Sequence, residues 1–130
     1  MIISIILAMI VIAVVIIYIK LSESTFFAER KFESLGRNYY ENSIYDELLK
    51  GHDEAKLKSV FGKYKKSGLI VKLRQLLNDA LLKKGEDYRS LFETEHYSCD
   101  TNKSKVIYRP HEPYGKKDYD AEFVLDCSEL

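Results

Sequence analysis

The sequence predicts an α+β protein in which one apolar helix precedes a small folded domain. Three observations lead to this class. The first 19 residues carry no charge, helical periodicity follows as far as residue 84, and alternating strand-like segments with turn residues take over after Gly85. Because the expected helices all come before the expected strands, the pattern indicates α+β and not a sheet wound through βαβ units.

Residues 1–20 are the expected transmembrane anchor. Between Ile2 and Ile19 we find one polar residue, Ser4, and the first charge is Lys20. A helix needs roughly 20 apolar residues to cross a hydrocarbon core of about 30 Å. A cleaved signal peptide fits less well, because no basic residue precedes the stretch and its length exceeds the usual apolar region. We therefore expect a single-pass protein whose first partner is the lipid bilayer.

The charges that flank this segment favour a cytoplasmic position for the rest of the chain. Four basic residues follow the segment, Lys20, Arg30, Lys31 and Arg37, and none precedes it. Lys and Arg near a span tend to remain on the cytoplasmic side. The extracytoplasmic side is the close alternative, because two cysteines are present and disulfides persist in oxidising compartments.

The other residues are expected to form a juxtamembrane helix or stalk over 21–42 and one small α+β domain over 43–130. Caps at Ser43 and Asp53, the stop at Gly51 and apolar faces predict about three helices, over 44–50, 54–66 and 69–84. Alternation and turn residues predict a three-stranded antiparallel sheet, with strands over about 88–99, 104–109 and 121–127.

The cysteines, Cys99 and Cys127, each close one of the expected strands. In a simple meander these two strand ends would lie about 10 Å apart, across the middle strand. A disulfide needs Cα atoms within about 7 Å. A bridge between Cys99 and Cys127 therefore requires the first and third strands to be neighbours, and the sequence leaves both states open.

Histidines and carboxylates do not form a recognisable metal motif, and we expect no cofactor. His96 and Cys99 are three residues apart, which on a strand places them on opposite faces. Asp118, Asp120 and Glu122 alternate along one strand face, but the spacing of a calcium loop is missing. A charged ladder of this kind is typical of an exposed edge strand.

Catalysis and nucleic-acid binding also lack a specific motif. The sequence contains no nucleophile elbow and no glycine-rich phosphate loop. Lys72, Arg74 and Gln75 open the expected helix over 69–84 as they would in a recognition helix, yet any amphipathic helix shows such residues to water. We therefore expect a protein that is not an enzyme and does not bind nucleic acid.

The segment between the second and third expected strands is the preferred site of recognition. Ten tyrosines are present and no tryptophan, and tyrosine is enriched in protein interfaces because it combines area with a hydroxyl at low entropic cost. The sequence HEPYGKKDY has the polar and aromatic character of an exposed binding loop. The residues of this expected partner-binding loop are Tyr108, His111, Tyr114, Lys116, Lys117 and Tyr119.

The favoured function is a membrane-tethered, non-enzymatic interaction protein that binds a partner protein at the bilayer, as an adaptor, an assembly factor or an inhibitory subunit. The alternative is an extracytoplasmic domain, stabilised by a disulfide, that binds a ligand or a toxin. A third hypothesis, a metal-dependent enzyme, requires His96 or His111 to converge with carboxylates in the folded domain.

Overall fold

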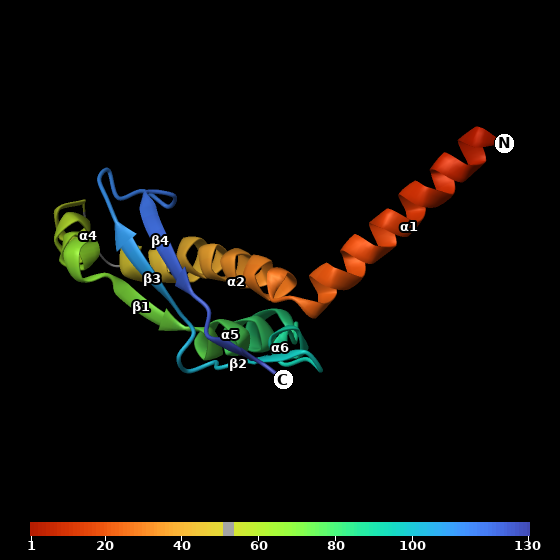
Figure 1. Cartoon of the computed structure of the whole chain (residues 1–130). Coiled ribbons are helices and arrows are strands. Elements are labelled where there is room, and N and C mark those ends of the chain that lie inside the picture. Colours follow the sequence, from red (N-terminus) through yellow and green to blue (C-terminus); the bar gives the residue numbers. More distant parts are fainter. Residues whose placement is uncertain (51–53) are drawn as a thin grey trace.

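A computed structural model describes residues 1–50 and 54–130, as one long apolar helix followed by a domain of helices and strands (Figure 1). The described elements are α1 (Ile2–Glu23), α2 (Phe26–Tyr39), the π-helical turn η1 (Tyr40–Ile44), α3 (Tyr45–Leu49), α4 (Glu54–Ser67), β1 (Leu69–Lys72), α5 (Leu73–Lys84), α6 (Arg89–Phe92), β2 (Tyr97–Cys99), β3 (Lys105–Pro110), β4 (Tyr119–Val124) and β5 (Cys127–Glu129). The mixed class, the N-terminal apolar helix and a three-stranded antiparallel sheet are confirmed. The helix count is not, because five α-helices follow α1 in the described residues instead of about three.

Helix α1 extends away from the domain (Figure 1). Its segment Ile2–Leu21 is long and apolar enough to cross a membrane, and none of the most apolar stretch is buried against the rest of the chain. The helix ends at Ser24, whose hydroxyl donates a hydrogen bond to the carbonyl of Leu21. The chain then turns, and α2 begins directly after Thr25.

Helix α2 continues without a break through η1 and α3, from Phe26 to Leu49, so the expected boundary between a stalk and a helix over 44–50 is absent. The π-helical turn accommodates one extra residue, and both Tyr40 and Ile44 lie in the core. Helix α4 matches the helix expected over 54–66 and runs one residue longer. The expected stop at Gly51 and cap at Asp53 lie outside the described residues.

The expected helix over 69–84 is divided into a strand and a helix. Strand β1 pairs antiparallel with β3, with Ile70 opposite Ile107. Helix α5 begins only at Leu73, where the side chain of Gln75 accepts the Lys72 N–H at 2.9 Å and caps the helix. The residues considered for a recognition helix are thus divided, because Lys72 ends β1 and only Arg74 and Gln75 lie in α5.

The three-stranded sheet has the order β1–β3–β4. The expected strand over 88–99 is absent from it, and only its end forms a strand, β2, in a separate pair with β5. Its first half contains the short helix α6, and just before this helix the Asp87 carboxylate accepts the backbone N–H of Arg89 at 3.1 Å in a local turn. The expected strand over 121–127 is likewise split, into the end of β4 and the start of β5.

The change from one sheet to the other occurs at Asp126. Its backbone N–H donates to the Ser104 hydroxyl at 2.9 Å, and its carbonyl oxygen accepts the Asp100 N–H at 2.8 Å. Strand β5 then lies directly beside β2, with Cys127 opposite Cys99, and a disulfide joins the two residues. The neighbouring arrangement of these strands is the one that a bridge requires.

The core lies where α2 and η1 cover the inward face of the sheet, and α5 packs against α2 at the end of β1 (Figure 1). Along β3 the inward residues are Val106, Tyr108 and Pro110, and all three are buried. Aromatic rings fill much of this space, since the Tyr40 ring lies 5.0 Å from that of Tyr108, between ring centres. Helix α2 packs so closely on β4 that a Cβ atom at Gly36 would overlap the Phe123 ring.

Candidate functional site

The three tyrosines of the expected partner-binding loop are core residues and not surface residues. Tyr108 has no exposed surface, and Tyr114 and Tyr119 keep 9% and 8% of theirs. The pairing of β3 with β4 explains this, because Tyr108 and Tyr119 both point to the inward face of the sheet. The expected tyrosine-lined recognition surface is therefore wrong.

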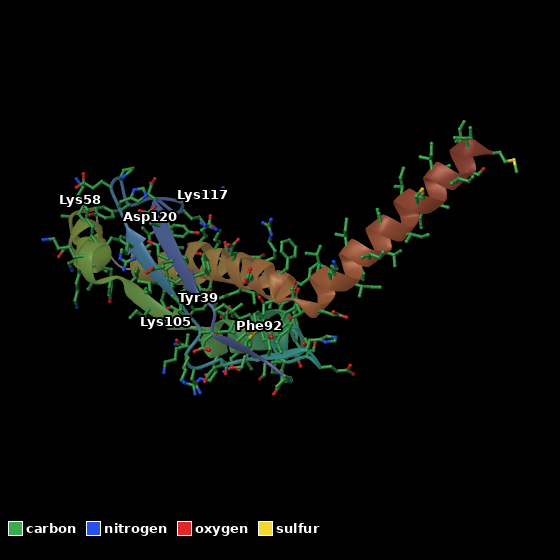
Figure 2. The ribbon with its side chains drawn as sticks, viewed as in Figure 1. Tyr39, Lys58, Phe92, Lys105, Lys117 and Asp120 are labelled. Carbon is green, nitrogen blue, oxygen red and sulfur yellow. A yellow bond between two sulfur atoms is a disulfide. The ribbon has the colours of Figure 1, made fainter. Side chains whose placement is uncertain are left out.

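The loop between β3 and β4 nevertheless presents two of the expected residues to solvent. The Asp118 N–H donates to the Gly115 carbonyl at 3.1 Å, which closes a four-residue turn, and the Asp118 carboxylate accepts the Gly115 N–H at 2.8 Å. Lys116 and Lys117 occupy the two central positions of this turn, and both are exposed. Figure 2 shows Lys117 at the end of the domain where the loop joins the two strands.

A buried aromatic residue fastens this loop to the domain. The Tyr114 ring stacks on that of Phe61, in α4, with 5.9 Å between ring centres. Its backbone N–H donates to the His111 carbonyl at 2.8 Å. Tyr114 has a φ of 60°, a left-handed conformation that is uncommon for a residue with a side chain. Burial of its ring against Phe61 holds this conformation, so the two lysines are carried by an ordered loop.

Lys116 and Lys117 face the outer side of α2 and η1 across an open groove of about 520 Å³. We call it the basic groove, and the residues that line it are Ser34, Arg37, Asn38, Glu41, Asn42, Lys116 and Lys117. Three cations and one carboxylate meet there, so the groove carries a positive charge. Its polar atoms are well suited to an acidic ligand.

The core positions the charged residues of α2 in this groove. The Arg37 guanidinium lies 5.8 Å from the centre of the Phe123 ring. The Tyr119 hydroxyl donates to the Glu41 carboxylate at 3.2 Å. Burial raises the pKa of Tyr119, and a hydrogen bond from Arg37 opposes the rise. Arg37 and Glu41 are thus both connected to one buried phenol and are not free to move independently.

The π-helical turn lies at one end of the basic groove. Turns of this type are rare and frequently found at functional sites. From within this turn, the side-chain amide N–H of Asn42 donates to the side-chain oxygen of Asn38 in α2 at 2.5 Å, on the exposed face. Sequence reasoning missed this helical wall. The signal was present, because Arg37 and Asn38 fall outside the apolar face of α2 and are exposed.

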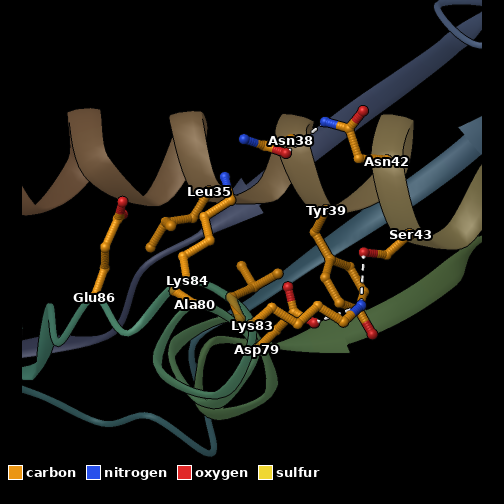
Figure 3. Close-up of a pocket in the computed structure, with 11 residues that line it drawn as sticks. Leu35, Asn38, Tyr39, Asn42, Ser43, Asp79, Ala80, Lys83, Lys84 and Glu86 are labelled. Carbon is orange, nitrogen blue, oxygen red and sulfur yellow. Dashed lines mark hydrogen bonds and ion pairs between the residues drawn. The ribbon is translucent and has the colours of Figure 1, made fainter.

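A second, smaller cavity of about 160 Å³ lies between α2, η1 and α5 (Figure 3). The Lys83 ammonium group forms an ion pair with Asp79 at 2.9 Å and donates to the Ser43 hydroxyl at 3.2 Å. The hydrogen bond to Asp79 raises the pKa of Lys83, and burial raises that of Tyr39. Ligand pockets usually measure about 300 Å³ or more, so we interpret this cavity as a polar contact that fastens α5 to the long helix.

The structure does not bring the histidines and carboxylates considered for metal binding into one site. Asp120 and Glu122 lie on the outer face of the sheet, where Glu122 pairs with Arg109 at 3.4 Å. Cys99 is in the disulfide. Within residues 1–50 and 54–130, no group of three or more His, Cys, Asp and Glu side chains is placed to hold a metal ion. His111 is half-buried at the base of the loop.

No family model matches this chain, and no curated protein or solved structure is detectably similar to it. The function is therefore argued from the geometry and chemistry of the chain itself. The basic groove is the strongest candidate, because it combines cations from two distant segments on ordered supports.

Proposed function

We propose that this chain is a membrane-anchored, non-enzymatic interaction protein that binds an acidic segment of a partner protein in the basic groove. Helix α1 serves as the single-pass anchor, and the folded domain supplies the specificity. The observation that carries the proposal is the convergence of Arg37, from α2, with Lys116 and Lys117, from the β3–β4 turn. The Gly115–Asp118 hydrogen bonds hold the backbone of the turn that carries the two lysines, so less backbone entropy is lost on association with a charged partner.

The shape of the basic groove favours a peptide segment over a compact ligand. It is an open channel between a helix and a loop and not an enclosed cavity. Asn38 and Asn42 add amide donors and acceptors along it, which suit the backbone of an extended chain. The better enclosed cavity beside Lys83 is too small for most ligands. The ligand-binding alternative therefore has less support than the binding of a protein.

The disulfide supports an extracytoplasmic position for this domain. Bridged cysteines are typical of oxidising compartments and rare in the cytosol, so the Cys99–Cys127 bond favours the alternative over the cytoplasmic side. The flanking charges argue the other way, but their rule is strongest for short loops of up to about 60 residues. The chain after α1 spans residues 24–130, and large domains are translocated largely regardless of charge.

Binding is tested with the full chain in nanodiscs of neutral lipid and a short fluorescent peptide of alternating glutamate and alanine. Fluorescence anisotropy should show saturable binding that weakens as salt is added. The double variant Lys116→Glu/Lys117→Glu should weaken binding by about tenfold or more, which corresponds to about 1.4 kcal/mol.

Lys65→Glu/Lys66→Glu provides the matched control, since it makes the same charge change on exposed residues of α4 outside the basic groove. It should bind the peptide nearly as well as the original chain. Absence of saturable binding, or an equal loss in the two double variants, would overturn the proposed groove.

The side of the membrane is tested separately, with a topology reporter fused after Leu130 and with thiol labelling of the whole chain. Alkaline phosphatase, which folds only after export, should be active in this fusion. Cys99 and Cys127 should react with a maleimide only after reduction. If both thiols react without reduction, the extracytoplasmic position is wrong and the cytoplasmic side is favoured.

A further inference from the structure

A shallow, open cavity of about 490 Å³ lies where α1 meets the domain. We call it the junction wedge. Its lining residues come from three elements, the last turns of α1, the first turns of α2, and α6, and they are Tyr18, Phe27, Arg30, Lys31, Ser34 and Leu91. In Figure 1 these elements meet at the base of the projecting helix. None of these residues belongs to the expected partner-binding loop, and Ser34 alone is shared with the basic groove.

The position of the junction wedge places it at the level of lipid headgroups if α1 spans the bilayer. Tyrosine is enriched at membrane interfaces, and Tyr18 lies near the end of the apolar segment, two residues before Lys20. The centres of the Tyr18 and Phe27 rings are 6.1 Å apart. The first turn of α2 therefore lies beside the end of the apolar segment, at the same depth as Tyr18. Arg30 and Lys31 lie about one helical turn, roughly 5 Å, beyond Phe27.

The walls of the junction wedge are apolar and its rim is cationic. Tyr18, Phe27 and Leu91 supply the apolar surface. On the rim, the Lys31 ammonium group lies 3.9 Å from the centre of the Tyr88 ring, and the Arg30 guanidinium lies 5.3 Å from that of Phe26. These rings hold the two cations in place without neutralising them.

The cations of the junction wedge keep their charge available for a ligand. Among the residues that the structure describes, neither Arg30 nor Lys31 forms an ion pair with a carboxylate. On α2, Phe27, Lys31 and Ser34 share one face, because residues three or four positions apart are neighbours on a helix. The Ser34 hydroxyl, the two cations and the aromatic rings therefore line the same open cavity.

We propose that the junction wedge binds one anionic phospholipid of the surrounding membrane. Its phosphate and acidic headgroup contact Arg30 and Lys31, and its glycerol backbone and upper acyl chains lie against Tyr18, Phe27 and Leu91. The proposal rests on the membrane anchor proposed above, and it holds on either side of the bilayer. The bound lipid would fix the angle at which the domain stands on the membrane, because it contacts both α1 and α2.

The test uses native mass spectrometry of the full chain released from nanodiscs that contain equal amounts of phosphatidylglycerol and phosphatidylcholine. The original chain should retain one phosphatidylglycerol molecule in clear preference to phosphatidylcholine. Arg30→Gln/Lys31→Gln should lower this preference by roughly fivefold for each cation removed, as expected for a basic residue beside an anionic surface. Leu91→Ser should reduce the retention of both lipids without changing the preference.

Lys65→Gln/Lys66→Gln is the matched control, because it removes the same charge from exposed positions of α4 outside both the junction wedge and the basic groove. It should retain phosphatidylglycerol as the original chain does. Equal retention of the two lipids by the original chain, or an equal loss of preference in the control, would overturn the lipid site.

Failure of the anchor is distinguishable from failure of the lipid site. A chain that does not float with vesicles of pure phosphatidylcholine, or that alkaline carbonate removes from them, would contradict the membrane anchor itself. A chain that inserts into these vesicles but shows no headgroup preference would contradict the junction wedge alone.

Discussion

The hydroxyl of Tyr108, on the central strand of the sheet, donates a hydrogen bond of 2.5 Å to the carbonyl oxygen of Gly36 in the last turn of α2. The absence of a side chain at Gly36 lets the Phe123 ring of β4 approach the same turn of the helix. These two contacts fix α2 on the sheet. They thereby orient the flank of α2 and η1 that carries Arg37 and Glu41 toward β4 and the β3–β4 turn.

Gly36→Ala should destabilise the domain. The added methyl group would overlap the Phe123 ring, and overpacking of this kind costs about 1–3 kcal/mol. The higher helix propensity of alanine offsets about 1 kcal/mol of this. We expect a net loss of about 1 kcal/mol in the free energy of unfolding, measured by urea denaturation in neutral detergent. Gly62→Ala is the control. Its methyl group would meet only the Tyr114 hydroxyl, at 3.7 Å, and should stabilise α4.

Tyr108→Phe and Tyr40→Phe should have different effects on stability, although both remove one buried hydroxyl. Tyr108→Phe loses the hydrogen bond to Gly36 and should lower the free energy of unfolding by about 0.5–1.5 kcal/mol. The Tyr40 hydroxyl has no hydrogen-bond partner in the part of the chain that the structure describes. Tyr40→Phe should therefore be neutral or stabilising in the same urea denaturation. A larger loss for Tyr40→Phe than for Tyr108→Phe would contradict this assignment.

Removal of the disulfide should destabilise the domain through the unfolded state. Cys99 and Cys127 are 28 residues apart, and closing a loop of this length is worth about 3–4 kcal/mol in the chain-entropy model. Cys99→Ser/Cys127→Ser should lower the free energy of unfolding by about this amount, which is measured as a lower urea concentration at the midpoint of unfolding. Reductant should lower the midpoint of the original chain and leave that of the double variant unchanged. A midpoint that reductant does not shift in either protein would show that the bond does not contribute.

Alkaline pH should unfold the domain through its buried phenols. Burial raises the pKa of Tyr40 and of Tyr108 above the ordinary value of 10.0. Because the folded pKa values exceed the unfolded ones, this stability is fully present below about pH 10 and is lost as the pH rises further. Tyrosinate absorbance should rise in two phases, the later one coinciding with loss of the near-ultraviolet circular dichroism. In concentrated urea all ten tyrosines should titrate in one step, and a single step in the folded protein would contradict the prediction.

Local patterns predicted the elements whose residues favour one structure only. The apolar run over 2–19 and the helix over 54–66 have no competing interpretation, and both are helical in the structure. By contrast, Ile70 and Val71 fit either the first turn of an apolar helix or a β-branched strand. Pairing with β3, a segment more than thirty residues away, selects the strand. Periodicity within the segment does not contain that information.

The candidate site could be predicted only in part, for the same reason. Lys116 and Lys117 are exposed as expected for turn residues, since glycine and aspartate flank them. Tyr108 and Tyr119 occupy the inward face, and a tyrosine serves equally well in a strand core and in an interface. Arg37 and Glu41 enter the site because α2 lies beside the loop, although about 75 residues separate them in the sequence.

The sequence by itself determined the apolar helix and the mixed class, because these depend on composition and on periodicity within short segments. The tertiary structure decided which strands pair, that Cys127 lies opposite Cys99, and that the tyrosines face inward. Those features depend on contacts between distant segments, where burial of apolar surface selects one pairing among several that the local sequence allows. The same contacts brought Arg37 beside Lys116 and Lys117, and Arg30 beside Tyr18.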